Sequence, residues 1–317
     1  MFSLPALETA AALVHRVLPP TPQIAWPLLA KRTGCVVFVK HENHQPVGAF
    51  KVRGGLVYVD GLIAAGTKPK GLVSATRGNH GQSLAFAGCR AGLAVAIVVP
   101  KGNSSEKNAA MRALGAELIE AGRDFDEARE TAAKIAQERG FILVPAFHPE
   151  LVRGVATYAL EFFRAVPDLA AIYVPIGLGS GICGLIHTRD LLGLNTEIIG
   201  VVSKQADCYA QSFEQGRIIT TQTALTLADG MACRVPMQEA LEIIRNGAAR
   251  IIRVSDAQIG AAIRAYHEDT HNLTEGAGAA PLAALLKERE RQHGKRIGLI
   301  LTGGNIDRSL YAKIIGC

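Results

Sequence analysis

Short hydrophobic runs alternate along the chain with stretches in which hydrophobic residues recur every three or four positions. The runs are rich in valine and isoleucine, and they predict strands at residues 35–39, 71–74, 94–99, 117–120, 171–174, 197–202 and 297–301. The longer amphipathic stretches predict helices at residues 105–114, 125–139, 155–164 and 257–267. Because the strands alternate with helices and are hydrophobic almost throughout, we expect an α/β fold whose parallel sheets are covered by helices on both faces.

The composition is that of an ordinary globular chain. With 317 residues, 49% of them hydrophobic and 20% charged, the chain is long enough for a large core in one or two domains. The formal net charge is +6, but the lysines and arginines are interleaved with acids and form no stripe. Nucleic-acid binding is therefore not expected, whereas a mildly basic surface suits a small anionic ligand.

The chain shows no sign of membrane insertion or secretion. No hydrophobic run approaches the roughly 20 residues of a membrane span. The six cysteines, among them Cys317, include no CxxC pair and no histidine at the spacing of zinc ligands. We therefore expect reduced, mostly buried thiols and a cytoplasmic location.

Three unusual loops directly follow predicted strands, where ligands of open α/β sheets bind. The first is Gly177-Leu178-Gly179-Ser180-Gly181, which leads into a helical pattern. Its glycines let successive backbone N–H groups point inward, the helix start adds partial positive charge, and Ser180 adds a hydroxyl. The segment can cradle an anion; the alternative is a glycine-rich turn without a ligand.

The other two loops carry polar side chains beside glycines. Thr76-Arg77-Gly78-Asn79-His80-Gly81 precedes a helix expected from Ser83, and its donors can hold a carboxylate or simply cap that helix. Thr302-Gly303-Gly304-Asn305 lets a flat ligand approach the backbone beside the Thr302 hydroxyl, or is an ordinary strand-to-helix turn.

Lys51 lies among small and hydrophobic residues, with Arg53 two positions away. Partial desolvation of its amine lowers the pKa and makes the amine a nucleophile toward an aldehyde. Taken alone, Lys51 is better interpreted as an ordinary helix lysine whose stem covers a hydrophobic surface. Only its combination with the three loops favours a chemical role.

The four segments together resemble a known family. AFKVRG, TRGNHG, GLGSG and TGGN, at residues 49–54, 76–81, 177–181 and 302–305, are similar in content and order to motifs of the tryptophan-synthase-β-like enzymes that use pyridoxal 5'-phosphate (fold type II). Within that class they resemble the threonine dehydratase and serine racemase group. Weaker matches at residues 228–230 and 274–278 extend the resemblance over nearly the whole chain.

The resemblance implies a role for each matching residue. Lys51 would carry pyridoxal phosphate as a Schiff base and move the Cα proton of the substrate. The other residues implied in cofactor binding are Phe50 and Glu275 beside the ring, Asn79 at the phenolic oxygen, Thr302 at the pyridine nitrogen, and Gly177, Leu178, Gly179, Ser180 and Gly181 around the phosphate. The residues implied in binding the substrate carboxylate are Thr76, Arg77, Gly78 and His80.

The resemblance also implies the architecture. It places two domains in the chain, each an open, mostly parallel twisted sheet with helices on both faces. Residues 1–69 and 149–317 would form the large cofactor-binding domain, and residues 70–148 a small mobile domain that carries the substrate loop. Substrate binding would then close the cleft and exclude water. A homodimer or homotetramer is expected from the same resemblance.

The implied reaction is elimination, because a neutral Thr302 hydroxyl would leave the ring nitrogen largely unprotonated and favour prompt loss of a β-hydroxyl. We expect an ammonia-lyase that converts L-threonine or a related 3-hydroxy amino acid to a 2-oxo acid and ammonia. The alternatives are a serine or threonine racemase, a β-replacement enzyme, a 3-hydroxyaspartate dehydratase, and, from another class, a non-catalytic protein that binds pyridoxal phosphate.

Two positions depart from the family. Arg77 stands where racemases of the family place a serine that acts as acid and base, and a guanidinium cannot replace it as a base. Arg77 either binds a second substrate carboxylate, which favours 3-hydroxyaspartate, or points outward or braces its loop. Val201 stands where metal-activated members have a glutamate, and Asp207 alone is a poor ligand set, so no divalent cation is expected there.

Overall fold

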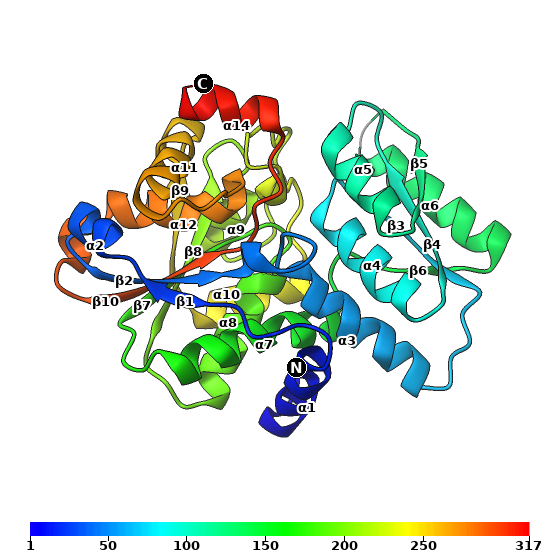
Figure 1. Ribbon diagram of the computed structural model, residues 1–317, viewed down its shortest axis with the longest axis horizontal. Coiled ribbons are helices and arrows are strands. Elements are labelled where there is room, and N and C mark those ends of the chain that lie inside the picture. The colour runs from blue at the N-terminus through cyan, green and yellow to red at the C-terminus, as the bar shows by residue number, and fades with distance from the viewer. Residues whose placement is uncertain (124, 317) are drawn as a thin grey trace.

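The computed structural model describes residues 1–123 and 125–316, which form two separate sheets (Figure 1). The six-stranded sheet has the order β1 (Gln23–Ala25), β2 (Val36–His41), β10 (Arg296–Leu301), β7 (Ala171–Pro175), β8 (Glu197–Ser203) and β9 (Ala248–Val254). The four-stranded sheet has the order β5 (Glu117–Glu120), β4 (Ala94–Val99), β3 (Gly71–Ala75) and β6 (Ile142–Leu143). Only β1 runs antiparallel to its neighbour among these strands.

The helices connect the strands in chain order. They are α1 (Leu4–His15), α2 (Pro27–Thr33), α3 (Lys51–Ala64), α4 (Asn79–Arg90), α5 (Ser105–Ala113), α6 (Phe125–Arg139), α7 (Pro149–Ala165), α8 (Ser180–Leu191), α9 (Cys208–Gln215), α10 (Gln238–Gly247), α11 (Asp256–Thr270), α12 (Gly276–Lys287), α13 (Arg289–Gln292) and α14 (Arg308–Ile315). Two short 3-10 helices, η1 (Glu42–His44) and η2 (Asp229–Met231), complete the described chain.

Helices cover both faces of each sheet, as the hydrophobic strands predict. On the larger sheet, α11 and α12 pack in one hydrophobic cluster, and α7, α8 and α10 pack in another on the opposite face. On the smaller sheet, α3, α4 and α5 share a cluster, and α6 packs on the other face. The expected α/β fold with mostly parallel sheets is confirmed.

Some element boundaries differ from the sequence expectation. α4 begins at Asn79 and not at residue 83, and α7 begins at Pro149 and not at residue 155. β1, β6 and β9 were not expected; the first two are only three and two residues long, and β9 mixes arginine with hydrophobic residues. Short or mixed strands lack the hydrophobic pattern on which the expectation depends.

The smaller sheet draws all its strands from within residues 70–148, the segment expected as the small domain. α3 precedes that segment but shares the hydrophobic cluster of the smaller sheet. The helix therefore lies between the two parts of the molecule, and the domain boundaries at residues 70 and 148 stay a prediction.

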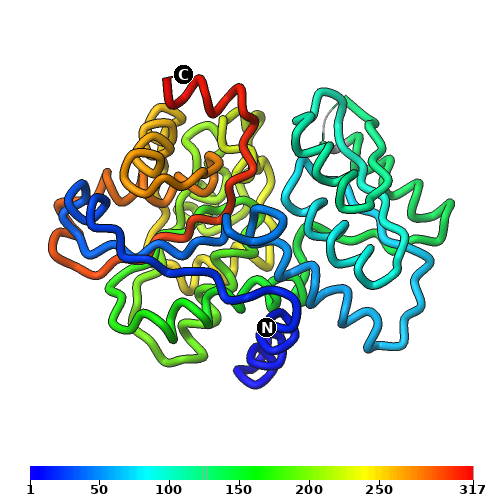
Figure 2. The backbone as a smooth tube through the Cα atoms, in the orientation of Figure 1, coloured from blue at the N-terminus to red at the C-terminus, as the bar shows by residue number. Residues whose placement is uncertain are grey.

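The two described ends of the chain lie apart, and most of the described thiols are buried. α1 and α14 lie on opposite sides of the molecule in Figure 2. The five described cysteines are free and four of them are buried, whereas Cys317 lies outside the described residues. Among the helices within residues 1–123 and 125–316, none has the length and hydrophobicity that crossing a membrane requires.

Candidate active site

Four helices begin close together where the two sheets face each other. α3 begins at Lys51, α4 at Asn79, α8 at Ser180 and α12 at Gly276. None of these four has a side-chain hydrogen bond at its N-cap, unlike α1, α5, α7 and α11. Because the first N–H groups of a helix have no partner within it, uncapped N-termini that converge leave donors and partial positive charge for an anionic ligand.

Lys51 is partly buried, and its Nζ donates a hydrogen bond of 2.8 Å to Ser180 Oγ. The same Nζ lies 5.1 Å from the centre of the Phe50 ring. Burial lowers the pKa of the Lys51 amine to about 8, because the charged form loses its hydration. At neutral to mildly alkaline pH the amine is therefore a much better nucleophile than an exposed lysine.

The glycine-rich loop between β7 and α8 is held in place by two buried tyrosines. The Tyr209 hydroxyl donates to Leu178 O at 3.0 Å, and the Tyr158 hydroxyl donates to Gly181 O at 3.0 Å. Gly179 has φ +100°, a conformation that side chains rarely adopt, and a Cβ on Gly177 would lie 2.3 Å from Gly230 O. Glycine is therefore required at both positions for this loop to form.

Thr302 follows β10 and is 2% exposed, and its Oγ1 has no hydrogen-bond partner. The Thr302 carbonyl accepts a hydrogen bond of 3.0 Å from Phe50 N, which places the segment before Lys51 beside the end of β10. A buried hydroxyl without a partner is uncommon in folded proteins, so Thr302 Oγ1 is a candidate group for binding a polar ligand atom. Thr302 and Lys51 thus lie at one site.

The substrate loop expected from the sequence lies at the end of β3. Gly78 N donates to Thr76 Oγ1 at 3.1 Å, and both residues are buried. His80 is 8% exposed, and its Nε2 has no partner. Burial, reinforced by the charge of Lys51, lowers the pKa of His80 to about 3, so the ring is neutral at physiological pH.

Arg77 differs from its neighbours because it is exposed. Across the described part of the chain, its guanidinium has no hydrogen-bond or ion-pair partner. The alternative that Arg77 braces its own loop therefore finds no contact to support it. A free cation on this loop stays available to a ligand.

Asn79 and Glu275 join the two sides of the site. Asn79 Nδ2 donates to Glu275 Oε1 at 2.7 Å, and Asn305 Nδ2 donates to Asn79 Oδ1 at 2.8 Å. Glu275 is 2% exposed, and its Oε2 accepts no hydrogen bond. Burial raises the pKa of Glu275 to about 7, although Lys107 opposes the shift.

Several residues that the structure places at the site have no role expected from the sequence. Asn305 belongs to the quoted TGGN segment, and Asp229 to the weaker match at residues 228–230. Lys107 has no local signal, because its partners are more than a hundred positions away. Ser83 Oγ donates to Lys51 O at 2.6 Å and fixes the start of α3 against α4.

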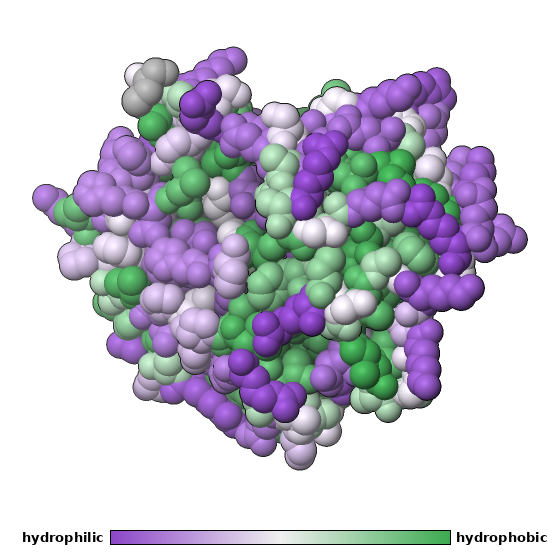
Figure 3. Space-filling view, turned by 45° about the vertical axis from the view of Figure 1, so that its right-hand side comes forward, coloured by the Kyte–Doolittle hydropathy of each residue, from purple (hydrophilic) through white to green (hydrophobic). Residues whose placement is uncertain are grey.

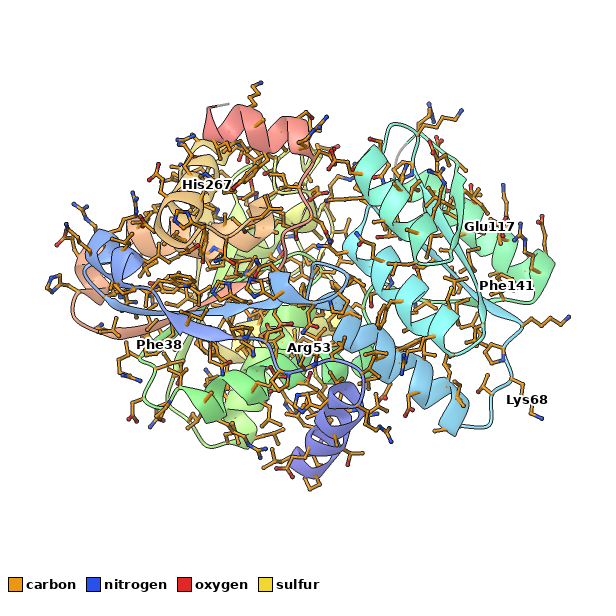
Figure 4. All side chains as sticks on the ribbon, viewed as in Figure 1. Phe38, Arg53, Lys68, Glu117, Phe141 and His267 are labelled. Carbon is orange, nitrogen blue, oxygen red and sulfur yellow. The ribbon has the colours of Figure 1, made fainter. Side chains whose placement is uncertain are left out.

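Arg53 lies two residues from Lys51, but its guanidinium extends into a buried ion cluster away from the amine. The guanidinium pairs with Glu42 at 2.7 Å and with Glu161, and Lys40 also pairs with Glu161. Arg53 is labelled in Figure 4. Because the Arg53 charge is paired within this cluster, it does not act on the Lys51 amine. This agrees with the lowered pKa of Lys51, which burial alone causes.

Comparison with known proteins identifies the family. The profile of the family described as pyridoxal-phosphate dependent enzyme matches residues 14–303. L-threonine ammonia-lyase from Geobacter sulfurreducens is 37% identical over 90% of this chain and 71% of its own length. Beta-hydroxyaspartate dehydratase from Paracoccus denitrificans is 34% identical over 96% and 97%. The structure of maize serine racemase superposes with a TM-score of 0.92 at 26% identity, covering 98% of this chain and 96% of that one. The chain therefore belongs to the family of pyridoxal-phosphate dependent enzymes.

Proposed function

We propose that this enzyme is an ammonia-lyase that converts L-threonine or a related 3-hydroxy amino acid into a 2-oxo acid and ammonia. The observation that carries the proposal is the partly buried Lys51 amine, which lies 2.8 Å from Ser180 at the start of α8. The Geobacter sulfurreducens relative, whose name states this activity on L-threonine, supports the reaction class.

The residues of the site fit pyridoxal phosphate. Lys51 would hold the cofactor aldehyde through its amine. The uncapped start of α8 suits a phosphate, because residues 177–181 combine tight glycine positions with the Ser180 hydroxyl. The partnerless Thr302 Oγ1 would suit the ring nitrogen, and Asn79 would suit the phenolic oxygen. Phe50 and Glu275 would border the ring.

The protein groups then divide the work. When bound, the cofactor supplies an electron sink for the bond that breaks at the substrate Cα. The Lys51 amine removes the Cα proton, which its lowered pKa favours near neutral pH. Thr76, Gly78 and His80 bind the substrate carboxylate with a hydroxyl and N–H groups, and the neutral His80 ring adds no charge. The Thr302 hydroxyl cannot neutralise a ring cation as a carboxylate would, which favours elimination.

A second candidate substrate is 3-hydroxyaspartate. The exposed, partnerless guanidinium of Arg77 on the substrate loop favours it, since guanidinium binds carboxylates in a two-pronged geometry. The name of the Paracoccus denitrificans relative states a dehydratase of beta-hydroxyaspartate. In this alternative the reaction is the same elimination, and Arg77 selects a substrate with a second carboxylate.

A serine or threonine racemase is the less favoured alternative, although the maize structural neighbour is a serine racemase. Racemisation needs an acid and base on the substrate face opposite Lys51. The resemblance puts Arg77 at the sequence position of the racemase serine, and a guanidinium stays charged at every physiological pH. Lys51 would then be the only Cα base, which is sufficient for elimination.

One assay separates these candidates. The enzyme is loaded with pyridoxal phosphate, and its visible absorbance is followed while L-threonine, L-serine or threo-3-hydroxyaspartate is added and 2-oxo acid and ammonia are measured. We expect a spectral shift together with a 2-oxo acid and ammonia in equal amounts. Appearance of the D-amino acid without ammonia would establish the racemase instead, and a spectral shift with no product would favour a non-catalytic binding protein.

The assembly and location stay predictions. A homodimer or homotetramer is expected, and the broad hydrophobic area on the face shown in Figure 3 is a kind of surface that often forms contacts between subunits. A cytoplasmic location is expected from the cysteine pattern, and a mobile domain over residues 70–148 is expected from the family resemblance.

A further inference from the structure

The first turn of α5 connects the part of the molecule built on the smaller sheet with the part built on the larger one. We call residues 104–107 the clasp. Ser104 Oγ donates to a carboxylate oxygen of Asp307, and Glu106 Oε1 accepts a hydrogen bond of 3.0 Å from Arg308 N. In Figure 1, α5 faces the segment that leads from β10 to α14. The clasp therefore joins the part built on the smaller sheet to the segment that leads into α14.

Lys107 is the part of the clasp that reaches the active site. It is 7% exposed, and its ammonium forms an ion pair with Asp229 and lies 3.9 Å from Glu275 Oε2. Its stem passes over the substrate loop so closely that a Cβ on Gly78 would lie 2.7 Å from Lys107 Cδ. One side chain thus contacts the substrate loop, the helix start at Glu275 and the segment before Gly230.

The charges of this arrangement favour closure. Burial lowers the pKa of Lys107, but Glu275 and Asp229 outweigh that effect, so the pKa is raised and the ammonium stays charged. Both acids belong to the part built on the larger sheet, whereas Lys107 belongs to the smaller one. A buried ammonium is stable only when it is paired. Lys107 is therefore satisfied when the two parts are together and unsatisfied when they separate.

Glu275 completes the link to the reacting groups. Its Oε1 accepts the hydrogen bond from Asn79. Its Oε2 accepts no hydrogen bond but lies 3.9 Å from the Lys107 ammonium. The other groups that face this carboxylate are Asp229 on η2 and the Gly303 backbone after β10. Lys107 thereby holds the Glu275 carboxylate and the Asn79 amide in one arrangement.

We propose that Lys107 is a positioning residue that fastens the substrate loop over the cofactor side of the site by pairing with Asp229 and Glu275 across the two sheets. The inference rests on the proposed function only for the identity of the substrate that the loop binds. Lys107 acts through other residues, since the substrate loop and Glu275 lie between it and the reacting atoms.

The test measures the order of the substrate loop directly. Hydrogen–deuterium exchange of residues 76–82 is followed in the cofactor-loaded full chain for wild type, Lys107→Met, Lys107→Arg and Asp229→Asn. We expect exchange in this segment to become about ten-fold faster or more in Lys107→Met, and less so in Lys107→Arg, because local opening is no longer opposed by the pairing. The exposed Lys101→Met, six residues away, is the matched control and leaves exchange unchanged.

Asp229→Asn makes the test independent of the lysine stem, because it changes only the far side of the pair. Exchange at residues 76–82 must also become faster in this variant, and the double variant Lys107→Met/Asp229→Asn must not exceed Lys107→Met alone. Unchanged exchange in both single variants would overturn the proposal. Faster exchange in Lys107→Met alone would also overturn it, since the lysine would then only pack on Gly78.

Kinetics with the preferred 3-hydroxy amino acid provide the second readout. We expect KM to rise more than kcat falls in Lys107→Met, because substrate binding must then close the site without the ion pair. A fall in kcat alone would contradict a role in closure. If the wild type turns over no 3-hydroxy amino acid, the proposed function fails, but the exchange experiment still decides the role of Lys107.

Discussion

Asn79 and Glu275 are 196 positions apart in the sequence, yet Asn79 Nδ2 donates a hydrogen bond of 2.7 Å to Glu275 Oε1. Asn79 begins α4 beside the four-stranded sheet, and Glu275 precedes α12 beside the six-stranded sheet. This bond therefore joins the two parts of the molecule at the active site. It also brings a buried carboxyl group, whose pKa burial raises to about 7, next to the residue expected at the cofactor's phenolic oxygen.

Glu275→Gln is expected to remove a pH-dependent part of the stability. The folded carboxyl keeps its proton up to about pH 7, whereas the unfolded one releases it near 4.5, so its contribution is fully present below pH 4.5 and is lost as the pH rises through 7. As the pH rises from 4.5 to 7, the wild type should therefore lose roughly 1–3 kcal/mol of unfolding free energy relative to Glu275→Gln. Urea unfolding of the cofactor-free wild type and variant below and above this pH range measures the loss. An equal change for Glu239→Gln, a substitution at an exposed residue, would contradict the expectation.

Lys51→Met is expected to stabilise the cofactor-free protein at neutral pH. Burial lowers the pKa of the amine from 10.5 to about 8, so between these values the unfolded chain binds more protons and the stability of the wild type rises with pH. Below pH 8 the fold must bury an ammonium, and the variant should gain roughly 1–3 kcal/mol over the wild type.

Thermal and urea unfolding at pH 7 and near pH 10 check this expectation, because the gain of Lys51→Met must shrink as the pH rises. The exposed Lys101→Met provides the comparison and should change little at either pH. A variant that is less stable than the wild type at pH 7 would show that Lys51 is charged and well paired in the cofactor-free protein. The same variant should fail to develop the visible absorbance of bound cofactor.

Arg77→Ala distinguishes the two candidate substrates. If Arg77 binds a second carboxylate, its loss should lower kcat/KM for threo-3-hydroxyaspartate by about ten- to a hundred-fold and leave the values for threonine and serine nearly unchanged, since a hydrogen bond to a charged group contributes about 1.5–3 kcal/mol. Steady-state kinetics of both proteins on the three substrates measure the ratio. A preference that does not change on substitution would rule out Arg77 as the group that binds a second carboxylate and would leave it as a solvated surface residue.

The buried ion cluster predicts a large difference between two glutamates. Glu42 is fully buried and pairs with Arg53, whereas Glu8 forms an exposed pair with Arg164. Glu42→Gln leaves part of the buried Arg53 charge unpaired and should lower the free energy of unfolding by about 3–5 kcal/mol. Glu8→Gln should change it by at most about 1 kcal/mol.

Urea unfolding of both variants at one pH gives the comparison. Similar effects of Glu42→Gln and Glu8→Gln would mean that the cluster rearranges so that Glu161 alone pairs the Arg53 guanidinium. In the folded protein, burial raises the pKa of Glu161, but Arg53 and Lys40 outweigh it and lower the pKa to about 2, so Glu161 stays ionised for such a rearrangement. The unfolding free energy of Glu42→Gln, measured as the pH is lowered below neutrality, then shows whether Glu161 has become the partner of Arg53.

The sequence predicted the parts of the site that depend on local chemistry. The hydrophobic run at residues 71–74 predicts a strand, which the structure has as β3 (Gly71–Ala75). The glycines of residues 177–181 predict the tight loop between β7 and α8. Asn79 was expected in a turn but begins a helix, because no capping side chain marks the start of α4. Lys107 gave no signal at all, since its pairing with Asp229 depends on how two sheets lie against each other and on no local spacing.

Asp207, where the sequence leads us to expect no divalent cation, pairs with Arg253. Its guanidinium donates to Asp207 Oδ2 at 2.8 Å and to Glu214 at 2.6 Å, so both carboxylates already face a cation that belongs to the chain. Val201, where metal-activated relatives are expected to have a glutamate, is fully buried in β8. Within the part of the chain that the structure describes, no group of three or more His, Cys, Asp or Glu residues is arranged to hold a metal ion.

Removal of divalent cations should therefore leave the activity of the wild type unchanged, and magnesium should not raise its melting temperature. Arg253→Ala removes the built-in cation and leaves Asp207 and Glu214 without a counter-charge, so this variant should be less stable and should regain part of its stability when magnesium supplies the missing charge. Thermal unfolding and activity after dialysis against a chelator, with and without added magnesium, measure both effects. Loss of wild-type activity on chelation, with recovery on adding magnesium, would show that the expectation of no divalent cation is wrong.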